Sequence, residues 1–289
     1  MESLLDCIHV IQQAYPALII TTTEPIDHGQ NNIVLKINGQ FVFRFPKYDA
    51  GLQALKRETS LLKYVHNRVS LTTPYPKFSQ LTTLNRSFMG CSYIPGEPLW
   101  KQVLIEQTSE TQTTLAEQLG TFLRTLHQIP ITAELSNLLP QADTASQWNT
   151  IFQQIRSKLF PRMRPDAQTS VIDHFEAFLS QPQHFMYTSV LKHGDFGAGN
   201  ILFDSSTGLL SGIIDFGNTS LGDPAYDFAG LLSSYGSNFV RYAAHSYPNF
   251  DHMWPRIKFY RGTFALLEAL FGLENSDRAA YTNGMTDYV

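Results

Sequence analysis

Two short segments near position 200 contain side chains that could perform chemistry. The first runs His193-Gly194-Asp195-Phe196-Gly197-Ala198-Gly199-Asn200, and fifteen residues after Asn200 comes Asp215-Phe216-Gly217. Transfer of a phosphoryl group asks a protein mainly for positioning and charge neutralisation. We expect Asp195 to orient or accept the proton of a hydroxyl. Asn200 and Asp215 would bind Mg²⁺ through oxygen atoms, the ligands that this ion prefers.

Each segment alone is a weak signal, because His-Gly-Asp and Asp-Phe-Gly both make good turns. Their combination around an apolar strand is much rarer and matches the paired loops of kinases, with Gly194 where kinases usually have arginine. The sequence has no GxxxxGK[ST], HExxH, GxSxG or paired CxxC motif. Its other candidate histidines are scattered, and we expect them to be structural or exposed: His9, His66, His127, His174 and His184.

An upstream strand and helix supply a second pair of charged residues. Side chains alternate along a strand, so Val42 and Arg44 share one face. Kinases carry Ala-x-Lys on the corresponding strand, so we expect Val42 to pack on the base and Arg44 to reach the phosphates. Glu58 on the next helix is spaced to pair with Arg44, whose planar fork suits phosphate and carboxylate. Taken alone, the two would form a surface pair; the downstream motif favours the nucleotide site.

A loop for the phosphates is expected before that strand, at His28-Gly29-Gln30-Asn31-Asn32. It lies between two strand-like runs and has one glycine, where a glycine-rich loop has three. Gly29 would let backbone N–H groups approach phosphate, and an ordinary hairpin turn explains the segment equally well. We include Gly29 among the nucleotide-binding candidates and keep the turn as the alternative.

The first ninety residues are rich in strand signals. Apolar, β-branched and aromatic runs predict strands at 32–37, 40–45 and 88–94, and helical spacing predicts a helix at 52–65. Asn38-Gly39 between the first two runs is a strong hairpin signal. Two prolines and a glycine in Pro95-Gly96-Glu97-Pro98 mark the boundary between two lobes.

The rest of the chain is mainly helical. Helical spacing recurs at 115–126, at 147–180 and from 227 onward, with short strands at 190–192, 200–203 and 210–215. The N-terminus has the apolar pattern of an amphipathic packing helix. We predict an α+β, protein-kinase-like fold, with a small β-sheet lobe containing one helix and a larger mainly helical lobe. The predicted parts are a nucleotide-binding lobe at 1–91, a hinge at 92–98 and a catalytic and substrate-binding lobe at 99–289.

Length and composition limit the class of protein. The 289 residues are too many for one small core. The chain is 43% hydrophobic and 16% charged, which is typical of a globular protein. Its formal charge of −4 disfavours a nucleic-acid partner, whose binding needs a basic surface. Two cysteines, Cys7 and Cys91, make no disulfide framework and fit a reducing cytoplasm. No apolar run reaches the length of a membrane helix, and we expect a monomer with no membrane association.

The sequence resembles the aminoglycoside phosphotransferase family and looks closest to its 2″-phosphotransferases. The matching stretches cover 41–47, 51–62, 88–99, 193–204 and 212–231. The resemblance implies ATP or GTP as phosphate donor, Mg²⁺ as cofactor and a small molecule with a hydroxyl as acceptor. It implies a nucleotide site made of Gly29, Val42, Arg44, Glu58, Ser92, Tyr93, Ile94 and Ile214, with the backbone of 92–94 binding the purine. His193, Asp223 and Asp227 would support the catalytic loop.

The sequence departs from the family pattern where an acceptor would bind. Aminoglycosides are polycations, whose sites need several carboxylates, yet Asn218 stands where the family often has Asp after Asp-Phe-Gly. No Asp or Glu occurs at 229–250, where Arg241 and His245 are found. The remaining acidic candidates are Asp251, Glu268, Glu274, Asp277 and Asp287. Aromatic residues are more plentiful and could form an apolar acceptor pocket or the core: Tyr235, Tyr242, Trp254, Phe259, Tyr260 and Phe264.

These observations leave three hypotheses open. The first is a kinase that acts on an aminoglycoside, the antibiotic-resistance type. The second is a kinase for a less charged hydroxylated molecule, such as a macrolide or a metabolite, which the sparse acidity favours. The third is a nucleotide-binding protein without turnover; the presence of Asp195, Asn200 and Asp215 together argues against it.

Overall fold

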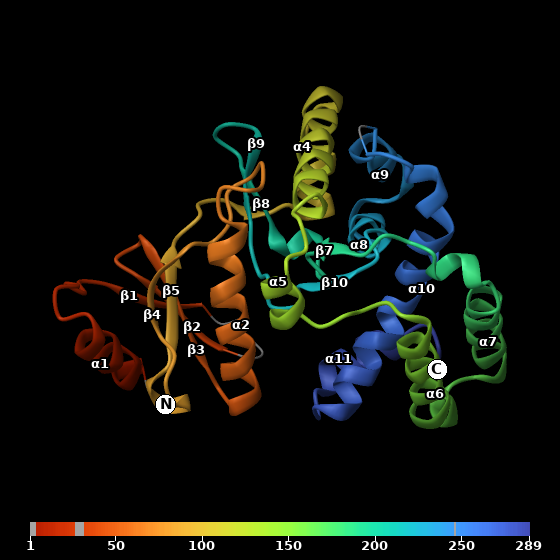
Figure 1. Cartoon of the computed structure of the whole chain (residues 1–289), viewed down its shortest axis with the longest axis horizontal. Coiled ribbons are helices and arrows are strands. Elements are labelled where there is room, and N and C mark those ends of the chain that lie inside the picture. The colour runs from red at the N-terminus through yellow and green to blue at the C-terminus, as the bar shows by residue number, and fades with distance from the viewer. Residues whose placement is uncertain (1–3, 27–31, 246) are drawn as a thin grey trace.

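A five-stranded antiparallel sheet forms the N-terminal part of the molecule in the computed structural model, which describes residues 4–26, 32–245 and 247–289 (Figure 1). The strand order is β1-β2-β3-β5-β4. The strands are β1 Thr23–Ile26, β2 Asn32–Ile37, β3 Phe41–Pro46, β4 Pro76–Gln80 and β5 Phe88–Ser92. The hairpin turn after β2 forms as predicted, with Asn38 and Gly39 at φ values of 53° and 63°. Strand β1 was not predicted; its Pro25 suits the sheet edge, where no ladder hydrogen bond is lost.

Two helices cover the two faces of this sheet: the amphipathic N-terminal packing helix that the sequence predicted, and the helix expected within the lobe. Helix α1 (Leu4–Ala14) places Cys7 and Ile11 in a hydrophobic cluster with Phe43 and Phe45 of β3. Helix α2 (Asp49–Val65) lies on the other side of the sheet in Figure 1. The alternation of β3 therefore turns its phenylalanines toward α1 and leaves Val42 and Arg44 for the opposite face.

The chain passes from this sheet to a second one within a few residues. Strand β5 ends at Ser92, and β6 (Glu97–Pro98) already pairs with β8 (Ile201–Asp204). Strand β8 also pairs with β9 (Leu209–Ile213), and β7 (Val190–Lys192) pairs with β10 (Ser220–Gly222). The catalytic segment found in the sequence lies between β7 and β8, and Asp-Phe-Gly lies between β9 and β10.

Helices build the remainder of the chain. The α-helices are α3 Lys101–Ile105, α4 Ser109–His127, α5 Ala133–Leu138, α6 Ala145–Lys158, α7 Pro165–Leu179, α8 Ala225–Tyr235, α9 Ser237–Ala243, α10 Phe250–Glu274 and α11 Arg278–Met285. Single 3₁₀ turns occur at Leu84–Arg86, Phe160–Arg162, Pro182–Phe185 and Ala198–Asn200. Helix α6 begins with a reciprocal capping box, in which Thr144 and Gln147 satisfy each other's backbone N–H groups. Helix α10 packs against both α8 and α11, and α4 packs against α9.

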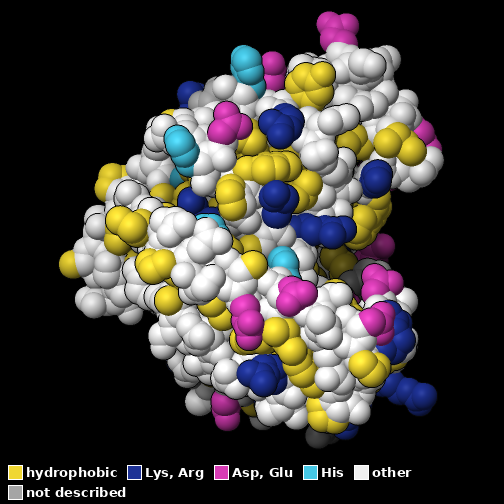
Figure 2. All heavy atoms as spheres, turned by 90° about the vertical axis from the view of Figure 1, so that its right-hand side faces the viewer, with side chains coloured by type: hydrophobic (Ala, Val, Ile, Leu, Met, Phe, Trp, Pro, Cys, Tyr) yellow, Lys and Arg dark blue, Asp and Glu magenta, His cyan; other side chains and the backbone are white. Residues whose placement is uncertain are grey.

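The surface carries both signs of charge. Figure 2 shows the side of the molecule that lies at the right in Figure 1, with basic, acidic and histidine side chains interspersed between neutral and apolar groups. Among the described helices, none combines the length and the apolar character that crossing a bilayer requires.

Candidate active site

The loop between β7 and β8 exposes Asp195 to solvent, and Asn200 of the same loop holds it by hydrogen bonds. The Nδ2 of Asn200 donates to the backbone oxygen of Asp195 at 2.9 Å and to its Oδ2 at 3.0 Å. One amide group thereby orients the carboxylate, and its own Oδ1 remains an acceptor. Crowding by protein atoms raises the pKa of Asp195; His193 opposes this shift and Asp215 adds to it. The arrangement suits a carboxylate that orients a hydroxyl group.

His193 joins the catalytic loop to the Asp-Phe-Gly segment. Its ring is fully buried, and Nε2 donates to the backbone oxygen of Ile214 at 3.1 Å. Its Nδ1 accepts the backbone N–H of Asp195 at 3.3 Å, so both ring nitrogens contact backbone groups of the two motifs. The ring also packs on Phe216, with centroids 4.6 Å apart. His193 thus sets the spacing between the two motifs.

Asp215 adopts an unusual backbone conformation at the mouth of the site. Its φ of 62° lies in the left-handed region, which a non-glycine residue rarely occupies and which is common at functional sites. Its side chain is 49% exposed, and Nη2 of Arg44 lies 3.6 Å from Oδ1. The backbone N–H of Gly217 donates to the same oxygen at 3.4 Å.

Arg44 and Glu58 form an ion pair next to Asp215. Nη1 of Arg44 lies 2.5 Å from Oε1 of Glu58, and the Glu58 side chain is only 4% exposed. The pair is therefore not the surface contact that served as the alternative. Burial raises the pKa of Glu58, and the Arg44 guanidinium opposes this shift. Arg44 contacts both Glu58 of α2 and Asp215 of the segment between β9 and β10, so it links the two parts of the molecule.

The donors near the loop match the needs of magnesium. Asn200 contributes an amide oxygen and Asp215 a half-exposed carboxylate. Among the described residues there is no group of three His, Cys, Asp or Glu placed to hold a metal. Kinase sites do not need one, because Mg²⁺ keeps several waters and binds through one or two side chains and the phosphates. The residues present therefore fit Mg²⁺ held together with a nucleotide.

The remaining predicted nucleotide residues differ in their surroundings. Ser92 ends β5 opposite Phe41, and the backbone N–H of Tyr93 donates to the oxygen of Gln40 at 2.7 Å. That N–H is therefore engaged within the protein, and the expectation that 92–94 contacts the purine rests on the other backbone groups of this segment. Ile94 is buried, and Ile214 donates its N–H to the oxygen of Asn200 at 3.0 Å. Gly29 lies outside the described residues.

Asp227 braces the catalytic loop from beneath. It is fully buried and accepts the backbone N–H of His193 at 2.8 Å and that of Gly194 at 2.9 Å. Nε2 of His127 lies 3.0 Å from the same carboxylate, and Nδ1 of His127 lies 2.7 Å from the hydroxyl of Tyr247. Burial alone would raise the pKa of Asp227, but the His127 hydrogen bond, nearby histidines and backbone donors outweigh it and lower the pKa.

Asp223 has a different set of partners and does not contact the loop. It binds Nε of Arg256 at 2.6 Å and the hydroxyl of Tyr260 at 2.9 Å, both from α10. Its backbone N–H donates to Asp143, which pairs at 2.7 Å with Lys192, the residue before His193. The support that Asp223 gives the loop is therefore indirect.

Sequence reasoning missed several residues of this network. His127 was assigned no role beyond a structural or exposed one, and Asp143, Lys192, Tyr247 and Arg256 were not singled out. No local pattern marks them, because each partner lies far away in the chain. Of the aromatic candidates, Tyr235, Phe259 and Tyr260 are buried in the core, and Tyr242 is 57% exposed.

Two cavities flank this machinery. The first, here called the loop-side pocket, has a volume of about 600 Å³. It is lined by Ala142, Asp143, Ser146, Gln147, Trp148, Thr150, Ile151, Lys192, Gly194, Asn218, Tyr226 and Leu267. Gly194 has a φ of +82°, and a Cβ there would lie 2.2 Å from the oxygen of Asn218. The two loops can approach this closely only with glycine.

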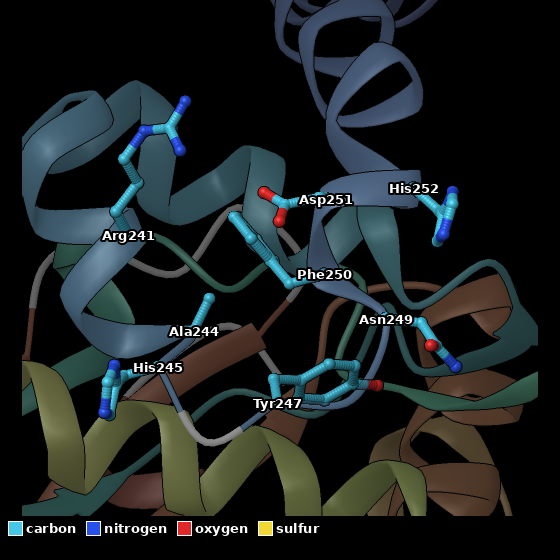
Figure 3. A pocket seen from close by; sticks show the side chains of 8 residues that line it. All are labelled: Arg241, Ala244, His245, Tyr247, Asn249, Phe250, Asp251 and His252. Atoms are coloured by element: carbon cyan, nitrogen blue, oxygen red, sulfur yellow. The ribbon is translucent and has the colours of Figure 1, made fainter.

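The second cavity, the α9–α10 pocket, has a volume of about 440 Å³. Figure 3 shows Arg241 and His245 on one side of it and Asn249, Asp251 and His252, from the start of α10, on the other. Tyr247 also lines it, and its hydroxyl is linked to the catalytic loop by hydrogen bonds through His127 to Asp227.

Comparison with known proteins gives consistent results. A family model described as "Phosphotransferase enzyme family" matches residues 22–260. Viomycin phosphotransferase of Streptomyces vinaceus is 30% identical over 204 residues, which are 70% of this chain and 69% of that protein. The solved GDP and kanamycin complex of APH(2″)-IIia is similar in fold, with a TM-score of 0.90 at 24% identity over 98% of this chain and 96% of that one.

Macrolide 2′-phosphotransferase type I is also similar in fold, with a TM-score of 0.77 at 18% identity over 99% of this chain and 97% of that one. These likenesses confirm the predicted kinase-like fold with its small sheet lobe and larger helical lobe. Because the family model spans most of the sequence, the chain belongs to the phosphotransferase enzyme family.

Proposed function

We propose that this protein transfers the γ-phosphate of ATP or GTP to a hydroxyl of a small molecule. The observation that supports this most is the meeting of three elements at one place. Asp195 is held by Asn200, and Asp215 faces Arg44, which in turn pairs with Glu58 of the first lobe. Charged groups from both lobes that meet at one place are suited to hold phosphates.

The roles follow from the surroundings of each side chain. Asp195 orients the acceptor hydroxyl, and Arg44 steadies the phosphates while Glu58 fixes its direction. Bound Mg²⁺ would be held by Asn200 and Asp215, and it supplies neutralisation of the phosphate charge. His193 and Asp227 keep the loop in place. We retain 92–98 as the hinge between lobes 1–91 and 99–289, with the purine contacted by the hinge groups other than the Tyr93 N–H.

The relatives favour an antibiotic as acceptor. The protein with 30% identity is named for viomycin, and one similar fold was solved with kanamycin. Aminoglycosides are therefore the first class to test. A less charged acceptor such as a macrolide is the second, because the loop-side pocket has few carboxylates. A protein that only binds nucleotide is disfavoured, since all three reacting side chains are assembled.

We propose a cytoplasmic location from the state of the two cysteines. Cys7 and Cys91 are buried in two different hydrophobic clusters, which suits the reducing cytoplasm. We propose a monomer, which light scattering of the purified protein would test directly.

The test is a coupled nucleotide-turnover assay with Mg²⁺, run with ATP and GTP against aminoglycosides, macrolides and small amino alcohols. Asp195→Ala should keep nucleotide binding and lower kcat by about 10² to 10⁴-fold, the range for a positioned proton acceptor. Asp215→Ala should weaken Mg-nucleotide binding as well. Asp173→Ala, on an exposed position of α7, is the matched control. Unchanged turnover in Asp195→Ala would refute the assignment.

A further inference from the structure

The loop-side pocket adjoins the catalytic loop. Gly194 and Asn218 line it, and they directly adjoin Asp195 and the Asp-Phe-Gly segment in the chain. The rest of the lining comes from residues 142–143, from α6, and from Lys192 of β7, Tyr226 of α8 and Leu267 of α10. A molecule in this pocket would therefore lie beside the catalytic loop, and the charges of the lining would decide which molecules enter.

The lining carries no net charge. Among the described residues that line it, Asp143 and Lys192 are the only Asp, Glu, Lys, Arg or His side chains. They pair with each other at 2.7 Å, and each side chain is only 4% exposed. The single carboxylate of the pocket is thus already neutralised by a lysine.

This ion pair is held from several sides and is not free to open for a ligand. Asp143 Oδ2 also accepts the backbone N–H of Asp223 at 3.1 Å. The ammonium of Lys192 lies 3.6 Å from the centre of the Tyr226 ring. The hydroxyl of Tyr187 donates to the backbone oxygen of Asp143 at 2.9 Å. Separating a buried pair of this kind leaves an uncompensated charge, so a cationic ligand cannot take Asp143 from Lys192 without large cost.

The other lining groups suit a neutral molecule. Asn218, Ser146 and Thr150 offer amide and hydroxyl groups, which bind hydroxyls without requiring charge. Tyr226, Ile151 and Leu267 add apolar surface. A mixture of neutral polar groups and apolar surface is typical of sites for uncharged or weakly charged ligands.

The acidic candidates from the sequence do not line this pocket. Of the five acidic candidates from the sequence, Asp251 lines the α9–α10 pocket, Glu274 pairs with Lys158, and Asp277 caps α11. The other two, Glu268 and Asp287, are exposed and do not line the loop-side pocket. A polycation entering this pocket would lose hydration without gaining matching charges.

We propose that the loop-side pocket selects acceptors of low positive charge, bound through neutral hydroxyl or amide groups and apolar contacts, and discriminates against polycations. The inference rests on the proposed phosphoryl transfer and narrows its acceptor class. Asn218 is the specificity-determining residue, because it is the exposed polar lining residue next to the Asp-Phe-Gly segment.

The experiment compares kanamycin, a polycation, with a macrolide that carries one amine. Binding is measured by calorimetry on enzyme loaded with Mg²⁺ and a non-hydrolysable nucleotide, and kcat/KM is measured in parallel. We expect the macrolide to be favoured by about tenfold or more in both. Its binding should change little between about 0.05 and 0.5 M salt, because no charge pair is formed that salt could screen.

Two variants sharpen the test. Asn218→Asp should shift the kanamycin-to-macrolide ratio toward kanamycin by about fivefold, as expected for one new partly exposed charge pair. Asn238→Asp adds the same charge on an exposed position of α9, away from the pocket, and should leave the ratio unchanged.

The outcomes separate this inference from the proposed function. Kanamycin binding as tightly as the macrolide or tighter, with an affinity that falls steeply with salt, overturns the inference while leaving phosphoryl transfer intact. Absence of binding by both molecules overturns it as well. If no acceptor of the full panel stimulates Asp195-dependent turnover, the proposed function falls, and the calorimetric order of kanamycin and the macrolide still decides the charge preference.

Discussion

Asp195 and Asp227 serve the same loop from opposite sides and show how environment assigns a role to a carboxylate. Asp195 is exposed and bound by one amide group, and its pKa is raised by the surrounding protein atoms and, less strongly, by Asp215. Asp227 is fully buried, yet its pKa is lowered, because His127 and two backbone N–H groups all point at it. The exposed carboxylate of Asp195 accepts few hydrogen bonds and can bind a ligand. The buried carboxylate of Asp227 has its hydrogen-bonding capacity filled by protein groups.

The difference follows from hydrogen bonding more than from burial. Burial raises the pKa of a carboxyl group, and donors aimed at the charged form lower it. At Asp227 the hydrogen-bond donors outweigh the effect of burial on the pKa, so the charged form stabilises the fold. At Asp195 few donors are present, so the charged form lowers stability and can bind a hydroxyl group. Sites with such costs are common where function and stability compete.

Asp227→Asn is expected to have the largest effect on stability. The amide keeps one acceptor but turns an N–H₂ toward backbone and imidazole donors, which leaves buried polar groups unpaired. We expect a loss of about 3 kcal/mol in the free energy of unfolding, measured by urea denaturation. Asp215→Asn, on a half-exposed side chain, is the control and should change stability far less. A value for Asp227→Asn within about 0.5 kcal/mol of the control would break the comparison.

Tyr247→Phe tests the outer end of the same hydrogen-bond chain. The hydroxyl binds Nδ1 of His127, so its removal should cost about 1 kcal/mol, the usual net value of one hydrogen bond. Because His127 then orients Asp227 less well, kcat should fall a few-fold while the nucleotide KM stays the same. Tyr242→Phe, on an exposed tyrosine of α9, is the control. Equal losses of kcat in Tyr247→Phe and Tyr242→Phe would show that the Tyr247–His127–Asp227 hydrogen bonds do not position the loop.

The contrast also explains what the sequence could reveal. Asp195, Asn200 and Asp215 lie within one stretch, where chemistry demands fixed residue types at fixed spacing. Arg44 and Glu58 were found because strand alternation and helix spacing are local rules. The strands, the Asn38-Gly39 turn and the long helices follow from periodicity, so these predictions are confirmed with ends shifted by a few residues.

The residues that bind the buried carboxylates Asp227 and Asp143 follow no local sequence rule. His127 lies on α4 and Tyr247 between α9 and α10, and their meeting with Asp227 depends on how those helices pack. The Lys192–Asp143 pair likewise joins β7 to the segment before α6. Strand β1 escaped notice because four residues containing a proline give almost no pattern. Asn218 lies between these two cases. The sequence indicated that it replaces an acidic residue of the family pattern, and only the fold shows which pocket it lines.

Asp195→Asn is expected to have the smallest effect on stability, with the opposite sign. A raised pKa means that the folded protein binds the proton more tightly than the unfolded chain does. The ionised group therefore costs stability above the folded pKa, and the cost disappears as pH falls below the unfolded value. At pH 7, Asp195→Asn should raise the free energy of unfolding by at most about 1 kcal/mol, because solvent screens an exposed carboxylate.

Thermal unfolding without nucleotide at pH 7 and near pH 3 measures this change in stability. A gain at pH 7 that vanishes at the lower pH, together with lost turnover, supports the contrast with Asp227. A loss of stability at pH 7 would mean that Asp195 is held as firmly as the buried brace, and that exposure does not separate the two roles.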